Sequence, residues 1–113
     1  MAREFRTHLE LKLKDPEFAR VFGAAQTKTQ AALALAKARR NAGMSQKMLA
    51  EKSGYSQPYI ANLERGDANP TLATLGALLA IMEQRLTTDV APLDHRALRP
   101  YRRARTRRQS SPC

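Results

Sequence analysis

The sequence predicts a small all-α protein of 113 residues, and its composition and patterning carry that prediction. Alanine and leucine are the commonest apolar residues, whereas aromatic residues make up only 5% of the chain, and both observations favour helix over sheet. Apolar residues recur at helical spacing in short segments that begin with capping residues or end at glycines. A chain of this length allows one compact domain, for which we expect four to five helices.

The net charge of +10 is concentrated at one end of the chain. Residues 1–95 contain 13 lysines and arginines against 10 acidic residues, whereas residues 96–113 contain seven arginines and no acid. This arginine-rich tail has two prolines and no hydrophobic period, so we expect it to be disordered when free. Its charge would also allow less specific binding to nucleic acid.

Nothing in the sequence indicates a membrane protein, a metalloprotein or an enzyme. No apolar run approaches about 18 residues and no signal-peptide pattern is present, so we expect a cytoplasmic protein. Cys113 is the only cysteine, which excludes an intramolecular disulfide. His8 and His95 have no partners at metal-ligand spacing, and no phosphate-binding glycine loop or nucleophile–base pair is recognisable. We therefore expect no catalytic residue, metal or cofactor.

Residues 1–30 are predicted to form an N-terminal helical arm. Its first segment, 3–14, has apolar residues four positions apart, although the alternation of its leucines would equally suit a strand. Asp15-Pro16-Glu17 is typical of the start of a second, short helix. The apolar face of that helix consists of Phe18, Val21 and Phe22. The arm either packs on the domain or grips a partner.

Residues 31–83 are predicted to form the compact domain. An alanine- and leucine-rich helix is expected over 27–41, with basic residues near its C-terminal end and Gly43 after it. The next two helices each start at a serine cap and end at a glycine: Ser45 to Gly54 and Ser56 to Gly66. Their inward-facing residues are Leu49, Ala50, Ile60 and Leu63. A last helix follows the cap at Thr71, with an apolar stripe of Leu72, Leu75, Leu78, Leu79 and Met82.

The pattern changes in residues 84–95, where β-branched residues alternate with others before Pro92. This alternation favours a short strand slightly over an extended coil. A lone strand in a helical domain has unpaired edges, which a second copy related by a two-fold axis would cover most simply. We therefore interpret this stretch as a dimerisation segment.

Residues 45–66 contain two short helices joined by a tight turn, which is the arrangement of a helix-turn-helix. Such a motif places the first turn of its second helix against base edges in the major groove of DNA. That helix begins at Ser56 and carries Gln57, Tyr59 and Asn62 opposite its apolar residues. Glutamine and asparagine can each pair with adenine through two hydrogen bonds, worth about 1–3 kcal/mol of discrimination.

Other side chains around the motif are candidates for phosphate contacts. Gln46, in the first turn of the supporting helix, can reach a phosphate together with the N-terminal amides of that helix. Lys47 and Arg65 flank the same surface. A single polar residue on a helix is usually plain solvated surface, whereas the joint placement around a capped turn favours DNA binding. Tyr59 can instead pack sideways.

Residues 31–83 resemble the helix-turn-helix domain of the Cro and phage-repressor type, the XRE family. The matching residues are Arg39, Gly43-Met44-Ser45-Gln46, Leu49-Ala50, Gly54, Ser56-Gln57, Ile60, Leu63-Glu64, Gly66 and Asn69-Pro70-Thr71-Leu72. This resemblance implies a phage-repressor-like bundle that binds a near-palindromic operator in double-stranded DNA as a homodimer and represses transcription.

The resemblance also implies roles for single residues. Gln46 falls where the family contacts the DNA backbone, and Gln57 and Asn62 fall where it reads bases. Arg39 and Glu64 fall where many members keep a partly buried ion pair, which fixes geometry more than it adds stability.

This chain departs from the family pattern at two positions, and its flanks suggest a narrower class. Tyr55 replaces a small aliphatic residue, and Pro58 offers no hydrogen-bonding side chain at a position that is often polar. Asp15-Pro16-Glu17-Phe18 before the domain, with a short extended segment behind it, resembles HigA-like antitoxins of type II toxin–antitoxin pairs. That resemblance implies binding to a small toxin of the RelE fold and repression of the protein's own operon. The alternative is a stand-alone phage- or plasmid-type repressor without a toxin partner.

Overall fold

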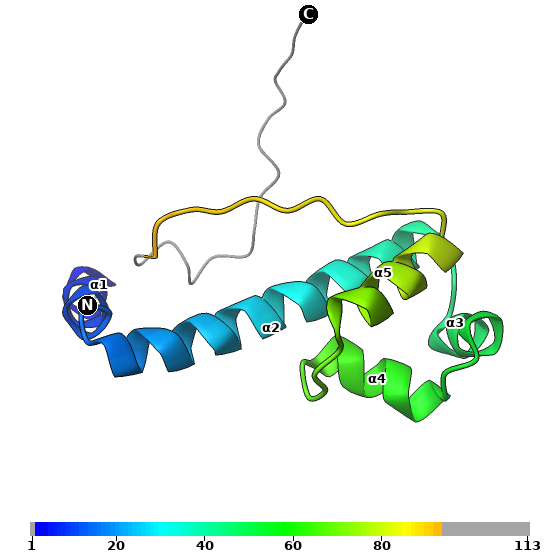
Figure 1. Ribbon diagram of the computed structural model, residues 1–113, viewed down its shortest axis with the longest axis horizontal. Helices are drawn as coiled ribbons and strands as arrows, with labels where there is room; N and C mark the ends of the chain where they lie inside the picture. Colours follow the sequence, from blue (N-terminus) through cyan, green and yellow to red (C-terminus); the bar gives the residue numbers. More distant parts are fainter. Residues whose placement is uncertain (1, 94–113) are drawn as a thin grey trace, which may run out of the picture.

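The computed structural model describes residues 2–93, which form five helices joined by short connections (Figure 1). The helices are α1 (Ala2–Lys12), α2 (Pro16–Asn41), α3 (Gln46–Ser53), α4 (Gln57–Arg65) and α5 (Leu72–Ile81). No strand occurs in the described residues, so the predicted all-α class is confirmed. The arginine-rich tail, predicted to be disordered, lies outside the described residues.

The largest difference from the predicted elements is α2, a single helix of 26 residues. The predicted division into a short helix and a separate helix over 27–41 is therefore wrong. The helix starts where predicted, because the side chain of Asp15 accepts a hydrogen bond from the Glu17 N–H at 3.1 Å. The residue that most disfavours a helix after this start is Gly23, whose cost of about 1 kcal/mol is too small to end one. The helix also runs without interruption through the expected boundary between arm and domain.

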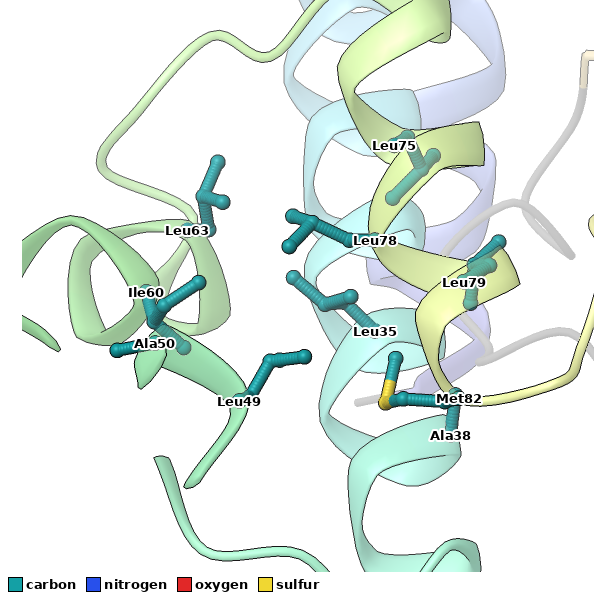
Figure 2. Close-up of a cluster of buried hydrophobic side chains, with 10 residues drawn as sticks. All are labelled: Leu35, Ala38, Leu49, Ala50, Ile60, Leu63, Leu75, Leu78, Leu79 and Met82. Carbon is teal, nitrogen blue, oxygen red and sulfur yellow. The ribbon is translucent and has the colours of Figure 1, made fainter. Parts of the chain in front are cut away.

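The hydrophobic core lies where the C-terminal half of α2 meets α3, α4 and α5 (Figure 2). Its buried members are Leu35, Ala38, Leu49, Ala50, Ile60, Leu63, Leu75, Leu78, Leu79 and Met82. The inward-facing residues predicted for α3 and α4 are all buried. In α5 the stripe is confirmed except at Leu72, which is 80% exposed because it is the first residue of the helix and projects beyond the core.

Side-chain caps and left-handed glycines fix the ends of the helices around this core. The hydroxyls of Ser45, Ser56 and Thr71 each accept a hydrogen bond from the backbone N–H three residues later, at 3.0, 3.2 and 3.0 Å. Such caps are worth about 1 kcal/mol each. Gly54 and Gly66 end α3 and α4 with φ angles of 85° and 80°, a region in which a side chain is strained.

The N-terminal arm, residues 2–30, consists of α1 and the first half of α2 and extends away from the core (Figure 1). Its first segment is helical, so the alternative of a strand is wrong. Leu9 is buried, whereas Leu11 is 61% exposed. The rings of Phe18 and Phe22 stack on each other with their centroids 5.9 Å apart. Much of the apolar surface of the arm thus remains uncovered.

Residues 84–93 have no regular secondary structure, so the short strand predicted in this region is wrong for the single chain. A strand requires a neighbour for its backbone groups, and the part of the chain that the structure describes contains no other strand. The start of the segment is anchored by Gln84, whose Nε2 donates to the carbonyl oxygen of Ala38 at 2.9 Å. From there the segment returns along α2 towards α1 (Figure 1), with Val90 94% exposed.

Candidate nucleic-acid interface

The turn between α3 and α4 is built by local hydrogen bonds and one glycine. Ser53 Oγ donates to a backbone carbonyl of α3 at 3.3 Å and accepts from the Tyr55 N–H at 3.2 Å. Gly54, with its positive φ, reverses the chain between these two bonds. Leu49 and Ile60, both 0% exposed, hold the two helices on the core. The start of α4 is left on the surface.

One face of α4 is buried and the opposite face carries the candidate DNA-binding residues. Ile60 and Leu63 belong to the core, whereas Ser56 and Gln57 are exposed at the start of the helix. Asn62 lies further along α4 and is half-buried. Ser56 Oγ accepts the capping hydrogen bond of α4, which leaves its O–H available to donate to another group.

Tyr59 is placed differently from the other candidates. It is half-buried and packs against the core cluster, and its ring centroid lies 5.2 Å from that of Tyr55. The sideways packing considered for Tyr59 is therefore what the structure shows. Tyr55 is 36% exposed, and its ring lies next to that of Tyr59 at the surface of the motif.

The far end of α4 carries a second set of polar contacts. The Arg65 guanidinium donates to Asn62 Oδ1 through Nη2 and to Asp67 Oδ2 through Nε, the latter at 3.1 Å. The side chains of Arg65 and Asp67 are 60% and 62% exposed, and exposed ion pairs of this kind contribute little to stability. These contacts hold Arg65 beside Asn62 on the outer surface.

Arg39 and Glu64 join α2 to α4 through an ion pair with two hydrogen bonds. Arg39 Nε donates to Glu64 Oε2 at 2.6 Å, and Arg39 Nη2 donates to Glu64 Oε1 at 3.0 Å. Arg39 Nη1 donates to the Met44 carbonyl oxygen at 2.8 Å. The two side chains are only 15% and 8% exposed. This geometry is the two-pronged contact that a planar guanidinium makes with a carboxylate.

The same carboxylate also binds Gln46, which the sequence analysis did not anticipate. Gln46 Nε2 donates to Glu64 Oε1 at 3.1 Å, across 18 positions of the sequence. We call the set formed by Arg39, the Met44 carbonyl, Gln46 and Glu64 the Glu64 clasp. Both the side chain of the first residue of α3 and the backbone just before its cap are held by this clasp. Lys47, next to Gln46, is exposed.

The clasp changes the acid–base properties of its ion pair. Burial raises the pKa of Glu64, but hydrogen bonds from Arg39 and Gln46 and the charge of Arg39 lower it by more, so its net pKa lies below the ordinary value. The hydrogen bond to Glu64 raises the pKa of Arg39. Both groups are therefore ionised at neutral pH.

Other kinds of site are not evident in residues 2–93. No group of three histidine, cysteine, aspartate or glutamate side chains is placed there to hold a metal ion. None of the helices in that range is long and apolar enough to cross a bilayer. A groove of about 560 Å³ lies between the middle of α2 and the loop before α5, away from α3 and the start of α4.

Comparison with known proteins identifies the family. The sequence pattern of the helix-turn-helix family matches residues 35–87. An uncharacterised helix-turn-helix-type transcriptional regulator of Sinorhizobium fredii, y4dJ, is 39% identical over 59 residues, which cover 52% of this chain and 77% of that protein. The chain belongs to the XRE-type helix-turn-helix family. The matched region begins within α2 at residue 35, so the whole N-terminal arm lies outside it.

A second relative in this family is longer than the matched region. An uncharacterised helix-turn-helix-type transcriptional regulator of Haemophilus influenzae is 46% identical over 55 residues, covering 49% of this chain. The match spans 54% of that protein, about half of its length. The shared part is therefore the helix-turn-helix domain, and the flanking segments have to be interpreted from their own residues.

Proposed function

We propose that the protein is a sequence-specific DNA-binding transcriptional regulator that represses by occupying a near-palindromic operator in the cytoplasm. The observation that carries this proposal is the placement of α4, which is fixed to the core by Ile60 and Leu63 while Gln57 is exposed at its first turn. A helix held in this way can enter the major groove with its polar face towards the base edges.

The candidate residues divide into base-reading and backbone-contacting groups. Gln57 and Asn62 are proposed to read bases from the exposed face of α4. The phosphate contacts are proposed for the residues around them: Gln46, Lys47, Ser56 and Arg65. Tyr59 supports the helix by packing and adds at most its hydroxyl group. Contacts with phosphates position the protein, whereas contacts with base edges specify the sequence.

A homodimer is part of this proposal. α5 lacks a polar face: its exposed residues are Leu72, Ala73, Gly76, Ala77 and Ala80. A helix that is apolar all round is normally buried, and a second copy would cover this surface. Residues 84–93, with Val90 and Leu93 exposed, add further apolar area that a second copy can cover.

The selection of bound sites from random DNA tests the regulator directly. We expect a two-fold symmetric site whose half-sites lie about one helical turn apart. Gln57→Ala should weaken binding to that site by about 1–3 kcal/mol and affect random DNA little. Equal losses on both kinds of DNA would remove Gln57 from the base-reading role, and the absence of any enriched site would reject sequence-specific binding.

We further propose that the regulator is the antitoxin of a toxin–antitoxin pair, because the N-terminal arm presents apolar surface that the core does not use. Phe5, Leu11 and Val21 are each more than half exposed. Val21 also lines the groove of about 560 Å³, whose other walls include Lys28 and Leu72. An exposed apolar surface of this kind is typical of a protein interface. The proposed partner is a small toxin of the RelE fold, with repression of the shared operon.

Co-expression with the product of a neighbouring reading frame tests the antitoxin role. The intact protein should relieve growth inhibition by that product and co-purify with it. Leu11→Glu and Val21→Glu should abolish both effects while leaving operator binding unchanged. If neither variant affects neutralisation, the arm is not the toxin-binding surface. If no neighbouring product is toxic, the stand-alone repressor is favoured.

The arginine-rich tail provides the basis of the third candidate, a less specific nucleic-acid binder. If its seven arginines all met phosphates, deletion of residues 96–113 would make the dependence of log K on log salt shallower by about six units. An unchanged salt dependence would show that the tail does not contact DNA.

A further inference from the structure

We propose that Glu64 is a positioning residue for the DNA-backbone contact of Gln46, so that the ion pair between α2 and α4 also sets DNA affinity. The inference rests on the proposed function and deepens it. It assigns a role in DNA binding to Glu64, although the side chain of this residue is only 8% exposed.

The hydrogen bonds of the carboxylate determine how the amide of Gln46 is oriented. Glu64 Oε1 accepts from Arg39 Nη2 and from Gln46 Nε2, at 3.0 and 3.1 Å. Because an ionised carboxylate can only accept, the amide must turn its NH₂ group towards Glu64. One N–H of that group is used in this bond. The second N–H is the donor that remains for a phosphate oxygen, which also only accepts.

The clasp reduces the cost of making this backbone contact. Ordering a free glutamine side chain costs conformational entropy, because the side chain loses rotamer freedom. In the clasp that side chain is already held before DNA arrives, and such preorganisation increases affinity without adding a contact. Arg39 Nη1 also holds the Met44 carbonyl at 2.8 Å, so the backbone leading into α3 is fixed by the same ion pair.

The clasp also links the two halves of the proposed interface. Gln46 begins α3, whereas Glu64 is the second-last residue of α4, the helix that carries Gln57. A bond between them fixes the start of α3 relative to α4. The distance between the phosphate contact and the base-reading residues is set in part by this bond.

A double-mutant cycle tests the positioning role in the full-length protein. Glu64→Gln keeps the shape of the side chain but removes its charge and replaces one oxygen by an NH₂ group, so it cannot accept all three hydrogen bonds that the carboxylate accepts from Arg39 and Gln46. We expect Glu64→Gln to weaken DNA binding about fivefold when Gln46 is present and less than about twofold in a Gln46→Ala background. The loss should be similar on the selected site and on random DNA, because a phosphate contact carries no sequence information.

Two additional measurements separate positioning from general destabilisation. Thr71→Ala removes the cap of α5 and should lower the melting temperature without changing DNA affinity. If Glu64→Gln does not fold, the apolar pair Arg39→Met with Glu64→Met retains the volume of the pair. This pair should again weaken binding only when Gln46 is present.

The outcomes are distinct. An additive cycle, in which the Glu64 substitution weakens binding equally with and without Gln46, overturns the positioning role and leaves the proposed function intact. A loss of affinity in Thr71→Ala that matches its loss of stability overturns it too. A wild-type protein that binds neither selected nor random DNA rejects the proposed function itself.

Discussion

The N-terminal arm and the helix-turn-helix core are both helical, but they are stabilised by different interactions. In the core, Leu35, Leu49, Ile60 and Leu78 are at most 1% exposed, and they come from four different helices. Among residues 3–30 of the arm, whose burial the structure describes, only Leu9 is buried. The core helices are short and stabilised by packing on one another, whereas the arm is helical largely through local interactions.

This difference shows that a segment can form a helix without being packed into the hydrophobic core. Short isolated helices are marginal in water, and most helical stability in proteins comes from packing an apolar face. α3 and α4, with eight and nine residues, depend on that packing. The arm instead extends from a long helix whose other half is anchored in the core. Its exposed apolar residues are available to a partner, as the antitoxin proposal requires.

The largest predicted effect contrasts one core residue with one arm residue. Ile60→Ala leaves a cavity in the core and should lower the free energy of unfolding by about 2–5 kcal/mol. Val21→Ala, on a side chain that is 62% exposed, should change it by no more than about 0.5 kcal/mol. Urea unfolding monitored by circular dichroism measures both values. Comparable losses in the two variants would show that the arm belongs to the cooperative core.

A pH-dependent contrast follows from two glutamates that form ion pairs, Glu64 in the core and Glu17 in the arm. Glu64 has a lowered pKa in the folded state, so the stability it provides is present above its ordinary value of about 4.5 and is lost as the pH falls through the folded-state pKa. Glu17 pairs with Arg20 at 2.5 Å, but both side chains are about 70% exposed, so this pair adds little.

Melting temperatures measured from pH 7 down to pH 2 test this contrast. Below about pH 4.5 the wild type should lose more stability than Glu64→Gln, whose difference from the wild type should shrink as the carboxylate is protonated. Glu17→Gln is the matched control in the arm and should follow the wild-type curve. A constant gap between wild type and Glu64→Gln at every pH would contradict a stabilising charge at position 64.

The sequence predictions were more accurate for features that depend on local interactions than for features that depend on contacts between distant residues. Caps at Ser45, Ser56 and Thr71 act over three residues, so the helices of the core were predictable from local patterns. The continuity of α2 was missed because Thr27 and Gly23 weaken the helical pattern locally, whereas helix propagation tolerates both.

Interactions between distant residues were harder to predict. The partners Arg39 and Glu64 came from family resemblance, since a separation of 25 positions leaves no periodic signal. The hydrogen bond from Gln46 to Glu64 was also missed, since these residues are 18 positions apart and the carboxylate had already been assigned Arg39 as its partner. The strand predicted after α5 does not form in the single chain, because alternation describes side chains, whereas a strand also requires a neighbouring backbone.

The smallest predicted effect uses one substitution in both regions. Gly76 in α5 and Gly23 in α2 are helical, neither has a positive φ, and an added Cβ would meet nothing within 4 Å at either position. Alanine should therefore favour the helix at each site by about 0.5–1 kcal/mol. Measured at a concentration at which the protein is monomeric, Gly76→Ala should raise the free energy of unfolding by about this amount.

In the arm, the stabilisation of the helix by alanine should be detected by hydrogen exchange and not by the main unfolding transition. Gly23→Ala should slow amide hydrogen exchange in residues 16–30 and leave the main unfolding transition unchanged, because that part of α2 opens separately from the core. Exchange slowed throughout the core would contradict this separation and make α2 one cooperative unit. An unchanged exchange rate in the arm would mean that Gly23 does not limit its helix. Together, Gly76→Ala and Gly23→Ala therefore measure how far the cooperative unfolding of the helix-turn-helix core extends along α2.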